Sequence, residues 1–353
     1  MPPLIAGRYA LQARLGSPGA QGEVYQALDT YEGDVVALKV LTTLPVGGPW
    51  MEAQILRRLV DPHILPIRNA DLHFGTPFLV TELAQHGTLE AKMVASGQLG
   101  VDVDYVVRWA RQACLGVARA HDLRLLHNDI KPANLFLNAQ NECLVGDFGV
   151  ATLMPPGASI VRPHGATAET AAPEVAVGWN TQSATASVLS DVYSIGAAAF
   201  WLLAARPAND FANVADFAAK MAIVAAQTPP RLRDLAPHVP QYVADVMEKA
   251  MARAPTDRYP TATSLAAALG ARPKVARSWR RTDEHPNHIA CWRGEPTRLG
   301  GTYVLCLEPG QRPTHCTIIA GHASSGNRIS RGCGTAYMRE WPIAIRSAMR
   351  KLG

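Results

Sequence analysis

The chain has 353 residues, of which 48% are apolar and 18% are charged, a composition that allows a sizeable core and excludes long disordered stretches. No basic N-terminal segment precedes an apolar stretch, and the longest apolar run, 195–205, is shorter than the ~20 residues of a membrane-spanning helix. We therefore expect a soluble cytoplasmic protein of about two domains with no membrane contact.

The net charge of +5 is unevenly distributed along the chain. From Arg272 onward there are 14 Lys and Arg residues against 5 Asp and Glu residues, a balance of +9, whereas residues 1–271 carry −4. This change predicts a domain boundary near residue 272 and different partners for the two parts. The six cysteines form no CxxC pair, and without a secretion signal we expect free thiols.

In chain order, the first part is predicted to be rich in strands and the second to be mostly helical. Apolar alternation predicts strands at 9–15, 23–28, 34–40 and 77–83, with a helix at 50–60. Helical spacing then recurs at 102–122, 187–205, 212–226, 240–252 and 262–269.

The C-terminal part has a pattern of its own. The polar, proline-bounded segment 272–287 is typical of a linker. Strands are expected at 288–292, 302–307 and 314–320, a fourth at 327–330, and an amphipathic helix at 337–352. These elements predict a small β-meander covered by one helix.

Four motifs suited to phosphate chemistry follow one another along the chain. The first is a glycine-rich turn with Gly16, Gly19 and Gly22, whose backbone can approach a phosphate closely. Hairpins use similar glycines, so this motif alone is weak. The second is Lys39, after the apolar Val36-Ala37-Leu38, where it can neutralise phosphate charge or simply protect a sheet edge.

The third motif groups Asp129, Lys131 and Asn134 in a loop ahead of an apolar strand. Asp129 can accept the hydrogen bond of an attacking hydroxyl, Lys131 can meet a transferred phosphoryl group, and Asn134 can bind a metal ion. The fourth motif, Asp147-Phe148-Gly149, places a second metal-binding carboxylate beside a glycine hinge.

Together these motifs resemble the signature of Hanks-type Ser/Thr protein kinases, which are eukaryotic-like kinases also found in bacteria. The resemblance covers residues 8–270. It includes further matches, namely Glu52 as the partner of the lysine, Thr81-Glu82-Leu83 as the adenine-binding hinge, Ala172-Pro173-Glu174 as the end of the activation segment, Asp191 as the anchor of the catalytic loop and Arg258 as the partner of Glu174.

The resemblance implies an α+β, bilobal protein kinase fold followed by a further domain. The β-rich N-lobe would occupy residues 1–83 and the mostly helical C-lobe residues 84–271. A linker at 272–287 would then lead to a small basic α+β domain at 288–353, for which we recognise no family.

The resemblance also implies transfer of the γ-phosphoryl group of MgATP to Ser or Thr hydroxyls of a protein. Asp129 and Lys131 would be catalytic, and Asn134 and Asp147 would hold Mg²⁺, with Mn²⁺ as an alternative. The nucleotide would be bound by the glycine turn, the third strand, the first helix and the hinge: Gly16, Gly19, Gly22, Val24, Ala37, Lys39, Glu52, Thr81, Glu82 and Leu83.

Two departures from the family pattern bear on this interpretation. The glycine turn is one residue longer than G-x-G-x-x-G, and Asn128 replaces the arginine of H-R-D. In the family that arginine binds a phosphate on the activation segment. We therefore hypothesise that activity depends little on activation-segment phosphorylation, although the segment offers Thr152, Ser159, Thr167 and Thr170. Thr167 matches the family threonine that hydrogen-bonds the catalytic aspartate and lysine.

Two other classes are weighed against an active kinase. A pseudokinase scaffold, which would bind ATP and partners without efficient catalysis, normally lacks Lys39, Asp129 or Asp147, and all three are present. A kinase-like small-molecule phosphotransferase usually lacks the A-P-E segment and Lys131. The protein substrate is not identified by the sequence, and a cognate phosphatase is a family-level expectation.

The C-terminal domain leaves four interpretations open. Its +9 charge favours docking of an acidic protein partner, or the domain is a structural appendage of the kinase lobe. Nucleic-acid binding is disfavoured because the helix that opens a double-stranded-RNA-binding domain is missing. A zinc site is the fourth interpretation, with candidate ligands at His285, His288, Cys291, Cys306, Cys316 and Cys333.

Overall fold

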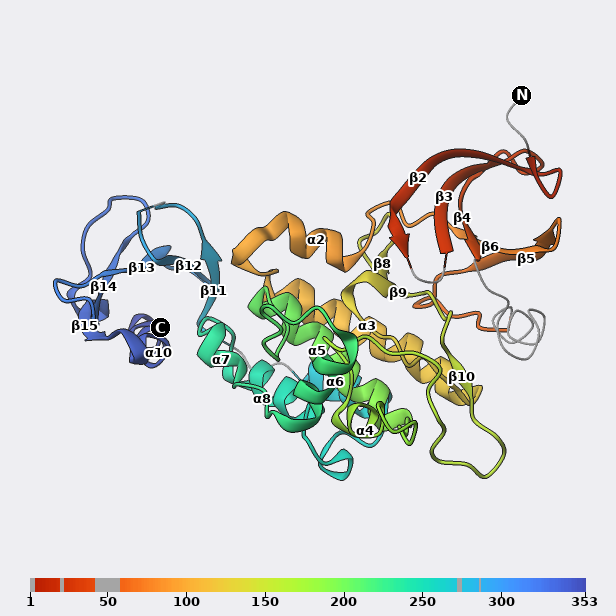
Figure 1. Cartoon of the computed structure of the whole chain (residues 1–353). Coiled ribbons are helices and arrows are strands. Elements are labelled where there is room, and N and C mark those ends of the chain that lie inside the picture. Colours follow the sequence, from red (N-terminus) through yellow and green to blue (C-terminus); the bar gives the residue numbers. More distant parts are fainter. Residues whose placement is uncertain (1–3, 20–21, 42–57, 272–274, 286) are drawn as a thin grey trace.

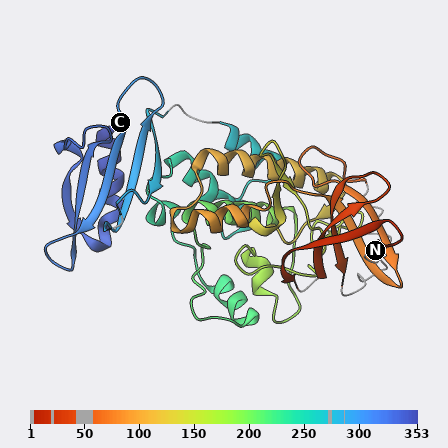
Figure 2. The ribbon, with the colours of Figure 1, turned by 90° about the horizontal axis from the view of Figure 1, so that it is seen from above.

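The structure is a computed structural model that describes residues 4–19, 22–41, 58–271, 275–285 and 287–353 (Figure 1). A β-rich N-lobe and a C-terminal domain lie at opposite ends of the molecule, with a helical lobe between them in both views (Figure 1 and Figure 2). Within the described ranges, no helix combines the length and the apolar character that crossing a bilayer demands.

The N-lobe is one antiparallel six-stranded sheet with the order β1-β2-β3-β4-β6-β5. Its strands are β1 (Leu4–Ile5), β2 (Tyr9–Gly19), β3 (Gly22–Asp29), β4 (Val35–Leu41), β5 (Ile67–His73) and β6 (Thr76–Glu82).

The two faces of this sheet have different roles. Along β4, Val36 and Leu38 are fully buried against Phe78 in the N-lobe core, whereas Ala37 and Lys39 point to the other face and are only partly buried. This alternation follows from the two-residue period of a strand. It directs Lys39 away from the apolar core and toward the helical lobe.

The C-lobe is built around α3 and α5, which pack on each other and on α9. Asp102 caps α3 and Ser187 caps α5, and the Ser190 hydroxyl accepts a hydrogen bond from the Ser187 amide. Both helices therefore begin where side chains satisfy free backbone amides. The helices are α2 (Leu89–Ser96), α3 (Val103–Asp122), α4 (Pro173–Val177), α5 (Val188–Ala204), α6 (Phe217–Ala226), α7 (Leu232–Leu235), α8 (Gln241–Ala250) and α9 (Ala262–Gly270), with 3₁₀ turns η1 (Gly97–Leu99), η2 (Pro132–Asn134) and η3 (Pro255–Asp257).

Two short strand pairs shape the region between the lobes. The hairpin of β8 (Leu135–Leu137) and β9 (Cys143–Val145) joins the loop after His127 to the segment before Asp147. The pair of β7 (Leu125–Leu126) and β10 (Thr152–Leu153) closes the same region from the other side. Loops separated by many residues are thereby held next to one another.

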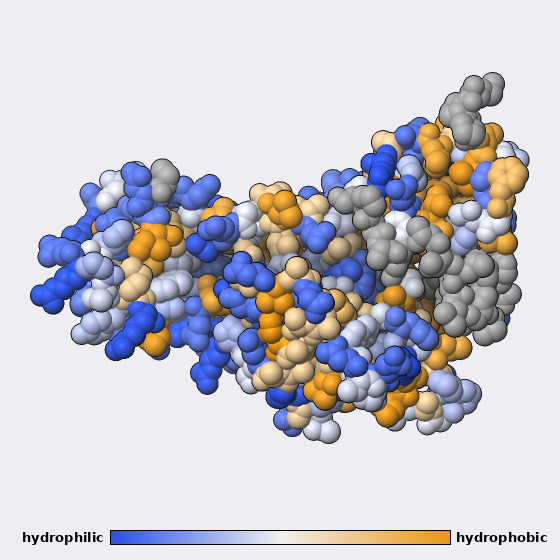
Figure 3. Space-filling model, viewed as in Figure 1, coloured by the Kyte–Doolittle hydropathy of each residue, from blue (hydrophilic) through white to orange (hydrophobic). Residues whose placement is uncertain are grey.

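The C-terminal domain is a five-stranded antiparallel sheet in sequence order, with one long helix packed on one face. Ile345, Met349 and Leu352 of the helix are buried as their spacing predicts, and Trp341 is half-buried. The visible surface of the domain is mostly hydrophilic (Figure 3). Its elements are β11 (Arg277–Thr282), β12 (Ala290–Pro296), β13 (Tyr303–Pro309), β14 (His315–His322), η4 (Ser330–Gly332), β15 (Gly334–Tyr337), η5 (Met338–Glu340) and α10 (Trp341–Leu352).

The predicted linker 272–287 contains a strand, β11, so the linker is shorter than expected. The charge of Arg277–Thr282 is typical of a linker, but the arginines lie on an edge strand, where charge is compatible with pairing. Trp279 is buried and packs over Gly294 on β12, where an added Cβ would lie 2.8 Å from the indole ring.

Two further expectations for this domain differ from the structure. The segment 327–330 forms only an isolated bridge between Arg328 and Gly321. The strand that pairs with β14 at the end of the sheet is Gly334–Tyr337 instead. The last helix begins at Trp341, since Pro342 suits a first helical turn. In the N-lobe, the predicted helix at 50–60 lies mostly outside the described residues, and residues 58–60 are not helical.

Candidate functional site

Three side chains of the loop between β7 and β8 converge with one residue of the later segment. The Asp129 carboxylate accepts hydrogen bonds from the Asn134 amide at 3.0 Å and from the Thr167 hydroxyl at 2.6 Å. The Lys131 ammonium lies 2.8 Å from the same carboxylate and donates to Thr167 Oγ1 at 2.9 Å. Asp129, Lys131 and Asn134 are therefore brought together as predicted, with Thr167 as the fourth member.

The loop that carries these residues is anchored by a buried carboxylate of α5. Asp191 accepts hydrogen bonds from the backbone amides of His127, at 2.9 Å, and of Asn128, at 3.0 Å. It also pairs with His121 Nε2 at 2.8 Å. Burial raises the pKa of the Asp191 carboxyl, but the hydrogen bonds and positive charge of His121 outweigh it, so the pKa lies below its usual value.

His127 and Phe148 are in contact at this point, with ring centroids 4.6 Å apart and the rings tilted by 45°. His127 is fully buried, and its Nε2 lies 3.0 Å from the carbonyl oxygen of Gly146. Both residues are packing groups, since His127 and Phe148 are both buried. They fix the backbone on which the neighbouring Asp147 depends.

Asp147 links this cluster to the N-lobe. Its Oδ1 atom lies 2.6 Å from the Lys39 ammonium of β4, and the two side chains are 29% and 15% exposed. Asp147 adopts a left-handed backbone conformation with φ of 56°, which is unfavourable for a non-glycine residue. The hydrogen bond from Gly146 N to the Asn134 carbonyl, at 3.0 Å, helps to hold it there.

Three of the predicted nucleotide-binding residues, Val24, Ala37 and Thr81, lie on the same face of the N-lobe sheet as Lys39. Val24 lies directly across from Lys39, and Ala37 lies across from Thr81 near the end of β6. Glu82 and Leu83 follow, with the Glu82 amide bonded to the Pro66 carbonyl at 3.0 Å. Glu52, the predicted partner of Lys39, lies outside the described residues.

The three glycines of the predicted turn lie in the hairpin of β2 and β3, where Gly19 pairs with Gly22. A shift of register between Leu15 and Gly19 accommodates the longer β2 side, which explains how the motif departs from the usual spacing without losing the hairpin. Gly22 is required sterically, since an added Cβ would lie 2.0 Å from the Val40 carbonyl oxygen.

A buried ion pair closes the helical side of the site. Arg258 donates to both carboxylate oxygens of Glu174 at 2.7 Å, and its own side chain is fully buried. The same guanidinium donates to the backbone carbonyls of Leu189 and Ala252. The pairing predicted for these two residues is thus present, and it ties the end of the activation segment to the helices behind it.

Residues 9–268 match the family model of the protein kinase domain. The chain belongs to the protein kinase family. This family covers the N-lobe, the C-lobe and the whole cluster around Asp129, and it leaves the C-terminal domain outside.

Two of the named relatives are bacterial Ser/Thr kinases. The chain is 31% identical over 305 residues to the probable serine/threonine-protein kinase PknB of Corynebacterium glutamicum, a match that covers 80% of this chain and 46% of that protein. It is 29% identical over 326 residues to the serine/threonine-protein kinase PknL of Mycobacterium tuberculosis, covering 88% and 78%. The chain thus spans less than half of the PknB length.

A solved structure confirms the bilobal fold. The kinase domain of Mycobacterium tuberculosis PknI superposes with a TM-score of 0.56 at 23% identity, covering 74% of this chain and 95% of that chain. The likeness shows the fold alone. The β-rich N-lobe and helical C-lobe predicted from the sequence are therefore confirmed.

The kinase site departs from the family pattern at Asn128, which has a φ of 64°. Asparagine tolerates this left-handed conformation better than most residues. Its side-chain amide donates to the Thr152 hydroxyl at 2.8 Å and to the Val150 carbonyl at 3.2 Å. The catalytic loop is therefore bonded directly to the start of the activation segment, without a phosphate between them.

The oxygen donors of the site fit the divalent metal that the family uses. The Asn134 amide nitrogen bonds to Asp129, which leaves the carbonyl oxygen of the same side chain as the ligand atom. Asp147 contributes carboxylate oxygens, the ligand type that hard divalent cations prefer. A bound ion would supply positive charge beside the phosphates, and Lys39 holds one of these carboxylate oxygens in place.

One residue of the site was not predicted from the sequence. His121 lies in the last turn of α3 and bonds to Asp191, and both groups are buried or nearly so. A histidine in the last turn of a helix is common for reasons of helix polarity alone, so its position gave no specific signal. Only the fold brings it to a carboxylate 70 residues later.

Proposed function

We propose that the chain is an active protein kinase that transfers the γ-phosphoryl group of MgATP to Ser or Thr hydroxyls of protein substrates. The observation that carries this proposal is the cluster in which Asp129 is bonded to Asn134, Thr167 and Lys131. An acceptor, a cation and a metal-binding amide at one point are what phosphoryl transfer requires.

The roles follow from the chemistry of each group. Asp129 accepts the hydrogen bond of the substrate hydroxyl and takes its proton as the oxygen attacks the γ-phosphorus. The bond between that phosphorus and its bridging oxygen breaks, and ADP leaves. Lys131 lies next to the acceptor carboxylate, where its charge stabilises the phosphoryl group in transit. Lys39 and the hairpin of β2 and β3 hold the remaining phosphates.

Thr167 supports the Ser/Thr class of acceptor. Its hydroxyl bridges Asp129 and Lys131, so the segment that receives the substrate is tied to the catalytic groups themselves. The names of the relatives agree with this class.

The test is label transfer from γ-labelled ATP with Mg²⁺, to the chain itself and to a generic basic protein, followed by phosphoamino-acid analysis. We expect phosphoserine and phosphothreonine with wild type and none with Asp147→Ala. Phosphotyrosine would contradict the acceptor class. ATP binding without any transfer by wild type would favour the pseudokinase alternative.

A further inference from the structure

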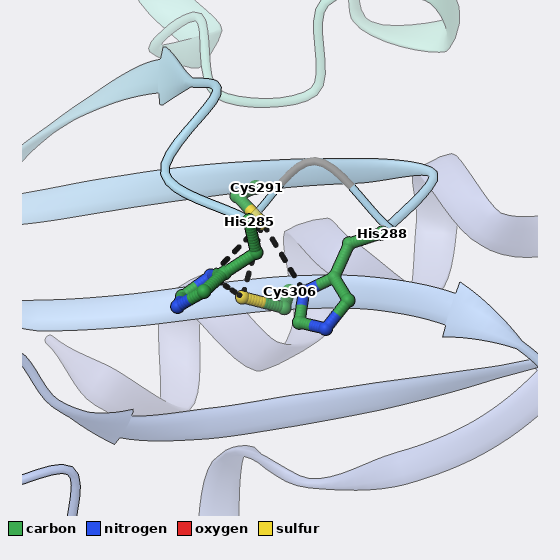
Figure 4. Close-up of side chains that lie close together, drawn as sticks. All are labelled: His285, His288, Cys291 and Cys306. Carbon is green, nitrogen blue, oxygen red and sulfur yellow. Dashed lines mark hydrogen bonds between the residues drawn. The ribbon is translucent and has the colours of Figure 1, made fainter.

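A second cluster of reactive side chains lies in the C-terminal domain, away from the kinase site. His285, His288, Cys291 and Cys306 each offer one ligand atom, and these four atoms lie within 4.8 Å of one another (Figure 4). Cys291 is 1% exposed and Cys306 is 4% exposed, whereas His288 is half-buried and His285 is exposed.

The arrangement follows from the strand register. Cys291 on β12 lies directly across from Cys306 on β13, so their side chains share one face of the sheet. The neighbours Trp292 and Leu305 point to the opposite face, which α10 covers. The two histidines come from the connection between β11 and β12 and reach over the two sulfurs (Figure 4).

Three of the six separations between the ligand atoms are close to those around a tetrahedral ion with two sulfur and two nitrogen ligands. The two sulfurs are 3.2 Å apart, His285 Nδ1 lies 3.3 Å from Cys306 Sγ, and His288 Nδ1 lies 3.4 Å from Cys291 Sγ. Bond lengths typical of zinc place two sulfurs about 3.7 Å apart and a sulfur and a nitrogen about 3.5 Å apart. Each separation is within about 0.5 Å of these values.

A fifth residue orients one of the ligands. His288 points Nδ1 at the cluster, and its other ring nitrogen, Nε2, lies 2.8 Å from Glu308 Oε1. A carboxylate on the far nitrogen of a metal-binding histidine fixes the tautomer that leaves the near nitrogen free to bind. A purely packing histidine needs no such arrangement.

We propose that His285, His288, Cys291 and Cys306 bind one structural zinc ion. The Cys₂His₂ donor set selects zinc among the common divalent ions, and four protein ligands leave no open position for a substrate. The ion joins the β11–β12 connection to β13 on the face of the sheet that α10 does not cover. A small domain with helix cover on only one face gains stability from such a link.

The site lies next to the contact between the C-terminal domain and the kinase C-lobe. Arg281, at the end of β11, donates to the Gln98 carbonyl of η1 at 2.9 Å. Only the short connection to His285 separates this contact from the first ligand. The ion therefore fixes the geometry of a strand that touches the kinase lobe, independently of any nucleotide.

The test measures zinc in the full chain, purified with a histidine-free affinity tag and analysed by inductively coupled plasma mass spectrometry. We expect about one zinc per chain in wild type and at least a tenfold lower content in His285→Ala and Cys306→Ser. His315→Ala and Cys333→Ser are matched controls outside the cluster and should retain the ion. Because His285 is exposed, its replacement should leave the circular dichroism spectrum intact.

A second measurement uses wild type alone, so its result does not depend on whether a variant folds. Wild-type chain stripped of metal and titrated with Co²⁺ should develop the intense thiolate-to-cobalt absorption of a tetrahedral site, and stoichiometric Zn²⁺ should abolish it. Wild type that takes up neither ion would overturn the proposal. So would zinc retained by His285→Ala and Cys306→Ser together, or an intact mass that shows a Cys291–Cys306 disulfide in place of two thiols.

Discussion

Asn128 places a neutral amide where many kinases carry an arginine, and its bonds to Thr152 and Val150 replace a phosphate-dependent contact. Of the four hydroxyl residues proposed as phosphorylation sites, Thr152 and Thr170 are buried and Thr167 bonds the catalytic groups, so only Ser159 is exposed. We expect Ser159→Ala to keep full activity. Steady-state assays without prior autophosphorylation check this, and a loss of more than tenfold would contradict it.

Asn128→Gly tests directly the contact between the catalytic loop and the start of the activation segment. Glycine keeps the left-handed backbone without strain but removes both hydrogen bonds to the activation segment. We expect kcat to fall by about tenfold while the KM for ATP stays nearly constant, because misplaced groups slow the chemical step more than nucleotide binding. A rise of about tenfold in the KM for ATP with unchanged kcat would show instead that Asn128 acts in nucleotide binding.

Thr167 acts as a positioning residue through Asp129 and Lys131. Thr167→Val keeps the shape and removes the hydroxyl, so kcat should fall by roughly 10- to 100-fold. Thr167→Ser restores the hydroxyl and should restore most of the activity. If valine and serine variants lose the same activity, the hydroxyl is not the group that matters.

At the scale of elements, the Arg258–Glu174 pair connects the end of the activation segment to the helices behind it. Removing one partner of a buried pair leaves the other charge uncompensated, a cost of about 3–5 kcal/mol. We therefore expect Arg258→Gln to lower the free energy of unfolding by about this amount in urea denaturation. Glu295→Gln breaks the exposed pair with Arg280, whose side chains are both about half exposed, and should cost about 1 kcal/mol or less. Equal effects of the two changes would contradict the structural role of Arg258.

The elements also show which features of the fold could be predicted from the sequence. Long helices with clear periodicity and caps, such as α3 and α5, begin within one residue of the predicted starts. The cluster around Asp129 follows from local spacing, since Asp129, Lys131 and Asn134 share one loop. By contrast, β11 was not predicted because of its charge, since a strand with three arginines among six residues resembles a polar linker.

Contacts between residues that lie far apart in the chain could not be predicted from the sequence. The pairing of His121 with Asp191 depends on the packing of α3 against α5, and no spacing rule relates residues so far apart. The sequence offered six candidate metal ligands, four of them cysteines. Only the strand register shows which of these cysteines lie close together. Cys316 and Cys333 lie elsewhere in the domain, whereas Cys291 and Cys306 are direct neighbours across β12 and β13.

At the scale of the whole molecule, the C-terminal domain rests on the kinase C-lobe. Arg346 of α10 donates to the Arg233 carbonyl at 2.6 Å and lies 3.2 Å from Asp234, both on α7. His238, between α7 and α8, is buried on the lobe side of this contact. Burial, together with the positive charge of Arg281, lowers the pKa of His238 to about 4.

This histidine makes stability depend on pH. The folded pKa lies below the ordinary value of about 6.5, so the unfolded chain binds the proton first as pH falls. The stability is fully present above pH ~6.5 and is lost as the pH falls from there toward about 4. Between pH 7 and pH 5 we expect wild type to lose about 2 kcal/mol more than His238→Gln, measured by chemical denaturation. Parallel pH profiles for the two proteins would show that His238 does not titrate in this way.

The central claim, that this site carries out phosphoryl transfer with Asp129 as the proton acceptor, is tested most directly by single-turnover transfer from bound γ-labelled ATP. Wild type is compared with Asp129→Asn, which keeps the shape of the side chain and removes its basicity. The account predicts a rate constant at least about 10³-fold lower in the variant, with the dissociation constant of MgATP changed by less than about threefold. Transfer at the same rate by both proteins, or none by wild type that binds ATP, would contradict it.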